Sequence, residues 1–278
     1  MEKINLHTHT TYCDGKNTAE EMVLSAIGKG FTTLGFSSHT MYPFAGDCHI
    51  AYKEHQKYAD EIKALSEKYR DKIQILLGFE VEYFPPMSIP RKSTYEEFKP
   101  DYIIGAVHYN IHKDQQGPVD GSESEVRALV EDIYNKDARA CVCDYFEAQR
   151  QMLKKGNFDI WAHPDLIRKR NRKLKLFDEN EDWYKKELAE TVKVAAKANI
   201  IAEINTGAIA RGAMDDVYPS AYFLRLIYEA GIPICVNSDC HNPPDIDCAF
   251  DRAYQAARNA GYKELTYPVK GKLVTIKL

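Results

Sequence analysis

The 278-residue sequence lacks the features that place a chain in or across a membrane. No apolar run approaches the roughly 20 residues needed to cross a bilayer. The first residues, MEKINLHTHT, have neither the apolar core of a secretory signal nor the arginine-rich character of a transit peptide. We therefore expect a cytoplasmic protein that is not inserted in a membrane.

The sequence also lacks a cysteine pattern typical of disulfides and a large net charge. The seven cysteines are an odd number, so we expect reduced thiols and no disulfide framework. The segment CVCD at 141–144 lacks the two-residue gap of a zinc knuckle, so we do not expect it to bind metal. A formal net charge of −4 gives no general attraction to phosphate backbones, and the basic run RKRNRKLK at 168–175 is too local to bind nucleic acid alone. We expect no nucleic-acid partner and make no prediction of oligomeric state.

What the sequence does contain is a repeated order of apolar strand, polar loop and amphipathic helix. Seven strands are expected within KINLHTH, TTLGFSSH, IQILLGFEVE, DYIIGAVHY, FDIWAHPD, IIAEINTG and IPICVNSD. Helices are expected around 18–29, 49–70, 122–155, 181–198, 217–230 and 247–260, the first opening with a capping box of Thr18 and Glu21. Seven such units predict an α/β protein, a parallel (β/α)7 barrel forming one domain over 1–278. The last segment, ELTYPVKGKLVTIKL, reads as one or two further strands.

Six of the nine histidines lie where a predicted strand ends, together with several acids. In a barrel the carboxyl ends of the strands line one mouth, so these side chains should converge. Residues i and i+2 of a strand point to the same side, which lets His7 and His9 bind one ion together. Imidazole with carboxylate suits Zn²⁺, Mn²⁺ or Fe²⁺. The pattern predicts a metal site that excludes the other three histidines, His49, His55 and His112.

At these residues the sequence resembles the polymerase and histidinol phosphatase (PHP) family of metallo-phosphoesterases. The resemblance rests on HTHTTYCDG, SSH, GFEVE, VHY, HPD and NSDCH, which occur in the family's order along nearly the whole chain. It is closest to the histidinol-phosphate phosphatase branch because of Asp14, the HPDLIRK stretch, and Arg211 within EINTGAIARGAMDDVYPS.

The resemblance implies a distorted seven-unit barrel that holds three divalent ions, with Zn, Mn and Fe all open as the metal. By matching positions, the first ion would be held by His7, His9, Glu80 and Asp239. Glu80 would bridge to a second ion held by His108 and His163. The third would be held by Asp14, His39 and His241.

A catalytic hypothesis follows from the same resemblance. A metal-bound hydroxide would attack phosphorus, without a protein nucleophile. Arg211 and Lys169 would hold the phosphate oxygens, although Arg168 or Arg170 could replace Lys169. Asp165 would shuttle a proton or have a structural role. The groups that recognise the rest of the substrate are less defined; loop residues suited to the task are Tyr42, Asp47, Asp120 and Glu125.

The favoured activity is hydrolysis of L-histidinol phosphate to L-histidinol and phosphate, a step of histidine biosynthesis. One alternative keeps the site but acts on another small phosphate ester or a nucleotide. A second is a non-catalytic metal-binding module, although all nine expected ligand positions are filled. A third, an amidohydrolase-like barrel, would commonly carry a bridging lysine at a strand end, where this sequence has Glu80.

Overall fold

The computed structural model describes residues 2–40 and 48–278, and its centre is a parallel seven-stranded sheet. The strands lie in the order β1 (Lys3–Asn5), β2 (Phe31–Phe36), β3 (Gln74–Glu82), β4 (Tyr102–Ala106), β7 (Ile160–Trp161), β8 (Ile201–Asn205) and β9 (Ile234–Asn237). Past the ends of β1 and β9, Thr8 and Cys240 form a parallel bridge, and the amide of His9 donates to the carbonyl of Cys240 at 2.9 Å. The sheet is thereby nearly closed, which confirms the predicted (β/α)7 barrel.

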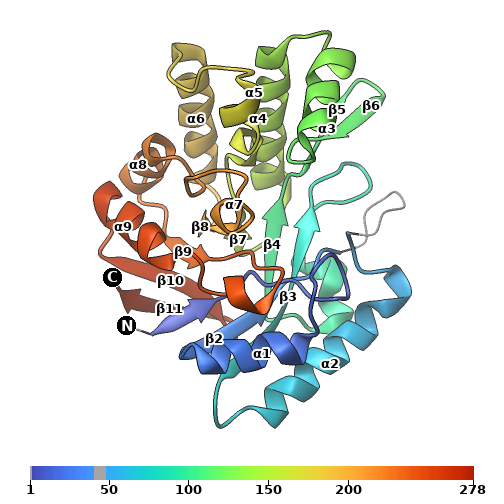
Figure 1. Ribbon diagram of the computed structural model, residues 1–278, viewed down its shortest axis with the longest axis vertical. Helices are drawn as coiled ribbons and strands as arrows, with labels where there is room; N and C mark the ends of the chain where they lie inside the picture. The colour runs from blue at the N-terminus through green and yellow to red at the C-terminus, as the bar shows by residue number, and fades with distance from the viewer. Residues whose placement is uncertain (1, 41–47) are drawn as a thin grey trace.

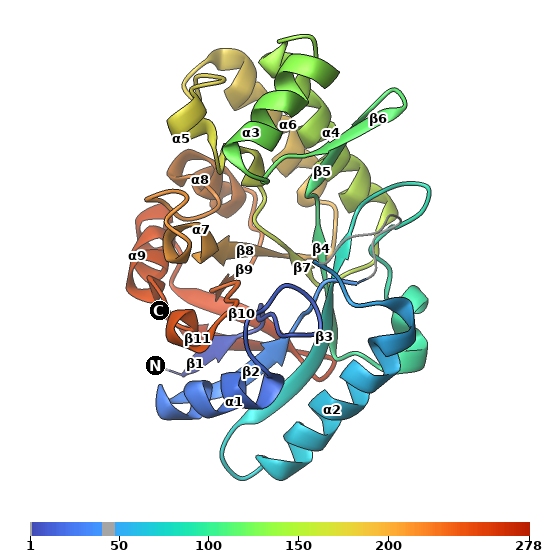
Figure 2. The ribbon, with the colours of Figure 1, turned by 45° about the vertical axis from the view of Figure 1, so that its right-hand side comes forward.

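Two antiparallel hairpins accompany the barrel. The expected C-terminal strands are β10 (Glu264–Val269) and β11 (Lys272–Lys277). The second hairpin, β5 (Tyr109–His112) with β6 (Gln115–Pro118), was not predicted, and it projects beside the mouth of the barrel (Figures 1 and 2). Tyr109 lies at the start of this hairpin, and Asp120 follows its end by two residues; both line the cavity described below.

Helices surround the barrel, with α1 and α2 beside β2 and β3 and with α4 and α6 at the opposite end of the molecule (Figures 1 and 2). The α-helices are α1 (Ala19–Gly28), α2 (His55–Lys68), α3 (Glu123–Ala128), α4 (Ala138–Lys155), α5 (Asn171–Leu174), α6 (Asp182–Ala195), α7 (Gly207–Ala210), α8 (Ala221–Glu229) and α9 (Phe250–Ala260). Short 3-10 helices span Tyr52–Glu54, Lys92–Phe98, Leu166–Arg168 and Pro243–Asp245. The predicted capping box of Thr18 and Glu21 is present. Within the described residues, no helix is both long and apolar enough to traverse a bilayer.

The prediction of one continuous helix over 122–155 is wrong. After α3 the chain makes a π-helical turn, Leu129–Ile133, and then breaks before α4. Asn135 and Lys136 take left-handed backbone conformations, with φ of 50° and 69°, and the side chain of Asp137 accepts a hydrogen bond from the amide of Ala140 to start the next helix. The two left-handed residues interrupt the helical backbone, and the N-cap Asp137 begins α4.

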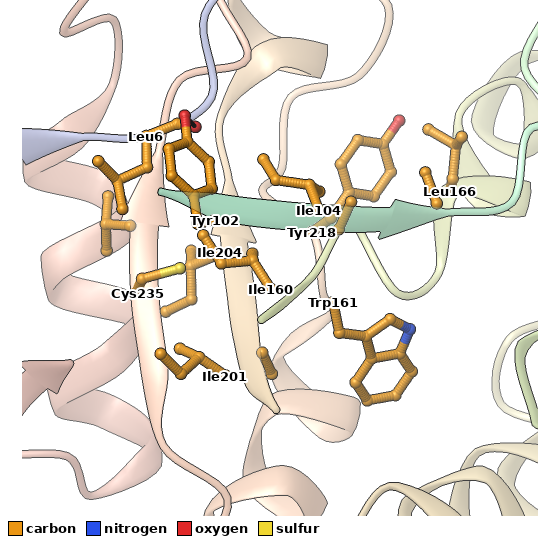
Figure 3. Close-up of a cluster of buried hydrophobic side chains, with 14 of the residues drawn as sticks. Leu6, Tyr102, Ile104, Ile160, Trp161, Leu166, Ile201, Ile204, Tyr218 and Cys235 are labelled. Atoms are coloured by element: carbon orange, nitrogen blue, oxygen red, sulfur yellow. Dashed lines mark hydrogen bonds between the residues drawn. The ribbon is translucent and has the colours of Figure 1, made fainter. Parts of the chain in front are cut away.

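The barrel interior is filled by aromatic and branched side chains, among which Tyr102 is central (Figure 3). Its hydroxyl donates to the carbonyls of Leu6, at 2.6 Å, and Phe36, at 3.0 Å. Glycine is required at one position each of β2 and β3, because a Cβ at Gly35 or Gly78 would lie 2.4 Å from an atom of this tyrosine. The packed interior closes the barrel below the strand ends and leaves the polar residues at its mouth.

Candidate metal centre

All nine predicted ligands lie at the carboxyl-terminal mouth of the barrel, and all but His7 and His9 line one cavity of about 210 Å³. The histidines come from the ends of five strands, while Glu80 lies within β3 and Asp14 on the turn after β1. The possible ligand atoms fall into four overlapping groups, each with its atoms within 4.8 Å of one another: His9, Asp14, His39, His241; His7, His9, Asp239; His7, Glu80, His163; and His39, Glu80, His108. The convergence expected from the strand-end pattern is therefore present.

The turn after His9 returns the chain to the same site. The amides of Cys13 and Gly15 both donate to the carbonyl of Thr10. A Cβ at position 15 would lie only 2.4 Å from the amide nitrogen of Thr10, so this turn requires glycine. The tight turn places Asp14 beside His241, with Oδ2 and Nε2 3.1 Å apart.

Glu80 is the hub of the cluster. Its side chain is almost fully buried, and ring nitrogens of five histidines lie within 3.5 Å of its oxygens. The shortest of these distances, 3.0 Å, are to Nε2 of His7 and of His163. A single carboxylate surrounded in this way needs positive charge between it and the rings, either protons or metal ions.

Two candidate ligands have a backbone conformation that L-residues rarely adopt. The φ angles are 23° at His163 and 49° at Asp239. Residues held in this way cost about 1–3 kcal/mol each and cluster at functional sites. Both lie directly beyond a barrel strand, where the surrounding hydrogen bonds fix the chain and aim the side chains at the cluster.

Burial and close charges shift the protonation of the cluster. Burial alone would lower the pKa of His108, but the carboxylates of Glu82 and Glu80 outweigh it and raise the pKa to about 10. His7 is likewise desolvated, and the carboxylates of Glu203 and Glu80 raise its pKa well above the ordinary value. Burial lowers the pKa of His39 to about 3 although Glu80 opposes the shift. Without a metal, the neighbouring carboxylates thus favour the protonated form of both the His7 and the His108 ring.

These residues fit divalent metal ions on chemical grounds. Nδ1 of His163 is buried without a hydrogen-bond partner, and Nε2 of His9 faces carboxylate oxygens of Asp239, at 3.2 Å, and Glu80, at 3.5 Å, without the geometry of a hydrogen bond. Buried ring nitrogens and carboxylates that converge without enough donors between them form a donor set suited to Zn²⁺, Mn²⁺ or Fe²⁺. The arrangement gives no support to a covalent thiol, because burial raises the pKa of Cys13, the cysteine beside Asp14, far above neutral pH, to about 12.

The basic stretch after β7 sends only one of its first three cations to the cavity. Lys169 lines the cavity, and its Nζ lies 2.7 Å from Oδ2 of Asp120. Arg168 instead pairs with Glu179 and Asp216. The Nε of Arg170 donates to the carbonyl of Gly121. Of the three candidates, Lys169 is therefore the one placed to meet a phosphate.

Arg211 also lines the cavity. Its Nη2 donates to Oδ2 of Asp239 at 2.8 Å, and its Nη1 donates to the carbonyl oxygen of the same residue at 2.9 Å. Nη1 also lies 3.1 Å from Nδ1 of His241. The guanidinium therefore lies against two candidate metal ligands and beside any oxyanion bound between them.

Asp165 lies behind the cavity wall. It is fully buried, its Oδ2 accepts a hydrogen bond from the amide of Ser220, and Arg168 lies 3.4 Å from the same oxygen. Burial raises its pKa to about 6. Two roles were predicted for Asp165, and these contacts favour the structural one. Proton transfer through Asp165 remains a prediction.

Of the four loop residues predicted to recognise the substrate, only Asp120 is found at the cavity among the described residues. Asp120 lines the cavity, whereas Glu125 accepts hydrogen bonds from Ser122 in a capping box at the start of α3. Tyr42 and Asp47 lie outside the described residues. The other three histidines (His49, His55, His112) belong to no group of possible ligands among the residues that the structure describes.

Three residues of the site, Glu82, Cys48 and Tyr109, were missed in the sequence. Glu82 and Glu203 are buried carboxylates that bond to His108 and His7, and Cys48 and Tyr109 line the cavity. Glu82 carried a usable signal, since it lies two positions after Glu80 on the same face of β3. Glu203 was marked in the sequence as the acid of the one predicted strand end without a histidine, and the structure places it against His7.

Comparison with known proteins agrees with this geometry. The family model described as "PHP domain" matches residues 5–207. The chain belongs to the PHP domain family. Among curated proteins, it is similar to a "Probable histidinol-phosphatase" of Schizosaccharomyces pombe, with 26% identity over 96% of this chain and 90% of the relative.

Two solved structures show the same PHP fold. HisK of Listeria monocytogenes superposes with a TM-score of 0.81 at 20% identity, covering 90% of this chain and 99% of that one. Histidinol phosphate phosphatase of Lactococcus lactis, solved with zinc, L-histidinol and phosphate, superposes with a TM-score of 0.74 at 21% identity, covering 98% and 99%. At this level of identity the two likenesses establish the barrel architecture.

Proposed function

We propose that this PHP protein is a metal-dependent phosphatase that hydrolyses L-histidinol phosphate to L-histidinol and phosphate, a step of histidine biosynthesis. The observation that carries the proposal is the joint placement of nine candidate metal ligands and two cations, Lys169 and Arg211, at the carboxyl-terminal mouth of the barrel. The names of its relatives support the same substrate. A non-catalytic module would have little reason to keep this complete set.

We propose that the nine ligands hold three divalent ions, with Zn, Mn and Fe all compatible with the donors. The sets are His7, His9, Glu80 and Asp239; Glu80, His108 and His163; and Asp14, His39 and His241. The first and third sets find support in the groups of His7, His9 and Asp239 and of His9, Asp14, His39 and His241, while Glu80 is close to both His108 and His163, at 3.5 and 3.0 Å. Divalent ions, when bound, lower the pKa of a coordinated water towards neutrality and screen the charge of a phosphate ester.

The chain's own cations complete the phosphate site. Arg211 is held by Asp239, so its guanidinium keeps a fixed direction and can stabilise charge that develops on a phosphoryl oxygen. Lys169 lines the same cavity and is oriented by Asp120, whose Oδ2 accepts from its Nζ at 2.7 Å. Both cations are positioned before the substrate enters, which reduces the reorganisation needed in the transition state.

The wall formed by Tyr109, Asp120 and Leu166 is the part of the cavity that we assign to the alcohol portion of the substrate. An amine suits the carboxylate of Asp120, and an imidazole suits the ring of Tyr109 and the apolar surface of Leu166. Burial opposes the ionisation of Asp120, but Lys169 and His108 outweigh it and hold its pKa well below the usual range. This carboxylate therefore stays charged at neutral pH.

The test is a phosphate-release screen of the protein loaded with Zn²⁺, Mn²⁺ or Fe²⁺. We expect kcat/KM for L-histidinol phosphate to exceed that for p-nitrophenyl phosphate, glycerol phosphate and nucleoside monophosphates. A nucleotide that is preferred over L-histidinol phosphate would assign the site to another phosphate ester. Equal values for all substrates would remove the proposed specificity.

A further inference from the structure

Two buried carboxylates outside the nine-ligand set contact the outer nitrogens of two candidate ligands. Oε1 of Glu203 lies 2.7 Å from Nδ1 of His7, and Oε2 of Glu82 lies 2.6 Å from Nδ1 of His108. The other nitrogen of each ring, Nε2, points at Glu80, at 3.0 Å for His7 and 3.5 Å for His108. Each of these rings is therefore held between an outer carboxylate and the central one.

The surroundings of Glu203 show that it acts as a pure acceptor. Beside His7, its Oε1 faces the side-chain amide of Asn237 at 2.9 Å. Its Oε2 accepts from the side-chain amide of Asn205 at 2.9 Å and from the main-chain amide of His163 at 3.1 Å. Three amides and one ring nitrogen converge on two oxygens, which matches an ionised carboxylate. Glu203 thereby ties β8 to β9, to the end of β1 and to the turn after β7.

Glu82 is simpler. Its Oε1 accepts from the main-chain amide of His108 at 2.9 Å, while its Oε2 contacts the ring of the same residue. Among the described residues, Glu82 accepts side-chain hydrogen bonds from His108 alone. The side chain is almost fully buried. A buried carboxylate that serves one histidine by two contacts fixes both the backbone position and the rotation of that ring.

We propose that Glu203 and Glu82 are positioning residues that hold the Nδ1 proton of His7 and of His108, so that Nε2 of each ring is kept free and aimed at a metal ion. This inference rests on the proposed metal-dependent function. An outer carboxylate that accepts the far N–H of a ligating imidazole fixes its tautomer and raises its basicity. Burying a carboxylate is costly unless its partners satisfy it, so a core-filling role alone would favour an apolar residue here.

The two carboxylates should act on different ions. No ligand group contains both His7 and His108, although Glu80 belongs to a group with each of them. Loss of Glu203 should therefore weaken chiefly the ion bound by His7, and loss of Glu82 the ion bound by His108. The ion assigned to Asp14, His39 and His241, whose shared ligand group contains neither His7 nor His108, should keep an affinity close to that of the unchanged protein.

The experiment measures metal affinity without any substrate. The full chain and its E82Q, E203Q and E203D variants are stripped with a chelator, and Zn²⁺ is then titrated back in competition with an indicator of known affinity. The matched control is D144N: Asp144 contacts Nδ1 of His112 at 2.9 Å, a carboxylate–histidine pair that does not line the metal cavity. Thermal unfolding of each chelated protein is recorded in parallel.

We expect E82Q and E203Q each to weaken one zinc site by about 10- to 100-fold, with D144N unchanged. E203D keeps the charge but shortens the side chain, so it should lie between E203Q and the unchanged protein. Should E203Q fail to fold because its amide group meets converging donors, E82Q and E203D still decide the matter. Wild-type zinc affinity at every site in E82Q and E203D would overturn the proposal, as would an equal loss of stability in chelated and zinc-loaded protein without a change in affinity. Failure to hydrolyse L-histidinol phosphate would instead count against the proposed function, because the zinc titration contains no substrate.

Discussion

The guanidinium of Arg211 donates two hydrogen bonds to Asp239, one to the carboxylate at 2.8 Å and one to the main-chain oxygen at 2.9 Å. The same aspartate has a left-handed backbone conformation and lies 3.2 Å from Nε2 of His9. The cation that we propose to bind phosphate thus also supports a proposed metal ligand. We expect the two proposed functions of the site to be coupled through this pair.

The first prediction concerns this coupling. Arg211→Ala should lower kcat/KM for L-histidinol phosphate by about 100- to 1000-fold, because it removes a preorganised group that stabilises transition-state charge. Most of the bound metal should remain, since Arg211 is not itself a ligand. Steady-state kinetics with metal analysis check both statements. Arg252→Ala is the matched control, because Arg252 pairs with Asp215 on the exposed surface; unchanged turnover in the Arg211 variant would remove its assigned role.

The second prediction separates Lys169 from its basic neighbours. Lys169→Ala should raise KM for the phosphate ester by about 10- to 100-fold through loss of one charge-assisted hydrogen bond. Lys173→Ala is the control, because Lys173 pairs with Glu123 at the surface four positions further along. Kinetics at fixed ionic strength make the comparison. Equal effects of the two substitutions would indicate a general charge effect and no specific phosphate contact.

The third prediction concerns Glu80, the carboxylate at the centre of the cluster. Because five histidine rings surround Glu80, Glu80→Gln should reduce the number of bound ions, and metal affinity should fall by about 100-fold or more, exceeding the loss typical of outer-shell partners. His112→Asn should retain every ion. Metal content after gel filtration provides the measurement. A Glu80 variant that retains full metal content would show that this carboxylate is not shared between ions.

The fourth prediction concerns pH and the chelated protein. The folded-state pKa of His108 is raised to about 10, and that of His7 is raised as well. A raised histidine pKa contributes stability that is fully present below the unfolded value of about 6.5 and is lost as pH rises through the folded value. The free energy of unfolding of the chelated protein should therefore fall between pH 7 and pH 9. Denaturant unfolding at several pH values tests this, and a constant or rising free energy would contradict the assigned charges.

The fifth prediction distinguishes the two roles of Asp165. Because its carboxylate bonds to the amide of Ser220 and neutralises Arg168 behind the cavity wall, Asp165→Asn should lower the free energy of unfolding by about 1–3 kcal/mol. Turnover of the folded, metal-loaded protein should change little. Denaturant unfolding and kinetics on one preparation answer the question. A large loss of kcat at unchanged stability would restore the proton-transfer role.

Much of the site could be predicted from the sequence because barrel geometry turns sequence order into spatial proximity. His7, His39, His108 and His163 each follow an apolar strand, and parallel strands bring such positions to one mouth. The i and i+2 spacing then places His9 beside His7. These inferences needed only the pattern of strands, which the apolar segments made clear.

What could not be predicted depended on tertiary contacts. The break at Asn135 and Lys136 contains neither glycine nor proline, so the segment 122–155 reads as one helix. The β5–β6 hairpin includes Gln115–Pro118, a segment without the apolar alternation of a strand. Glu203 looks like any strand acid until its four hydrogen-bonding partners, contributed by four different parts of the barrel, are seen together.

The central claim is that hydrolysis of L-histidinol phosphate depends on metal ions held by the nine-ligand cluster. Its most direct test is the kcat/KM for this substrate before chelation, after chelation with residual metal measured, and after return of Zn²⁺ or Mn²⁺. We predict that activity disappears with the metal and returns as the cluster is refilled. Full turnover by protein shown to be free of metal would contradict the account.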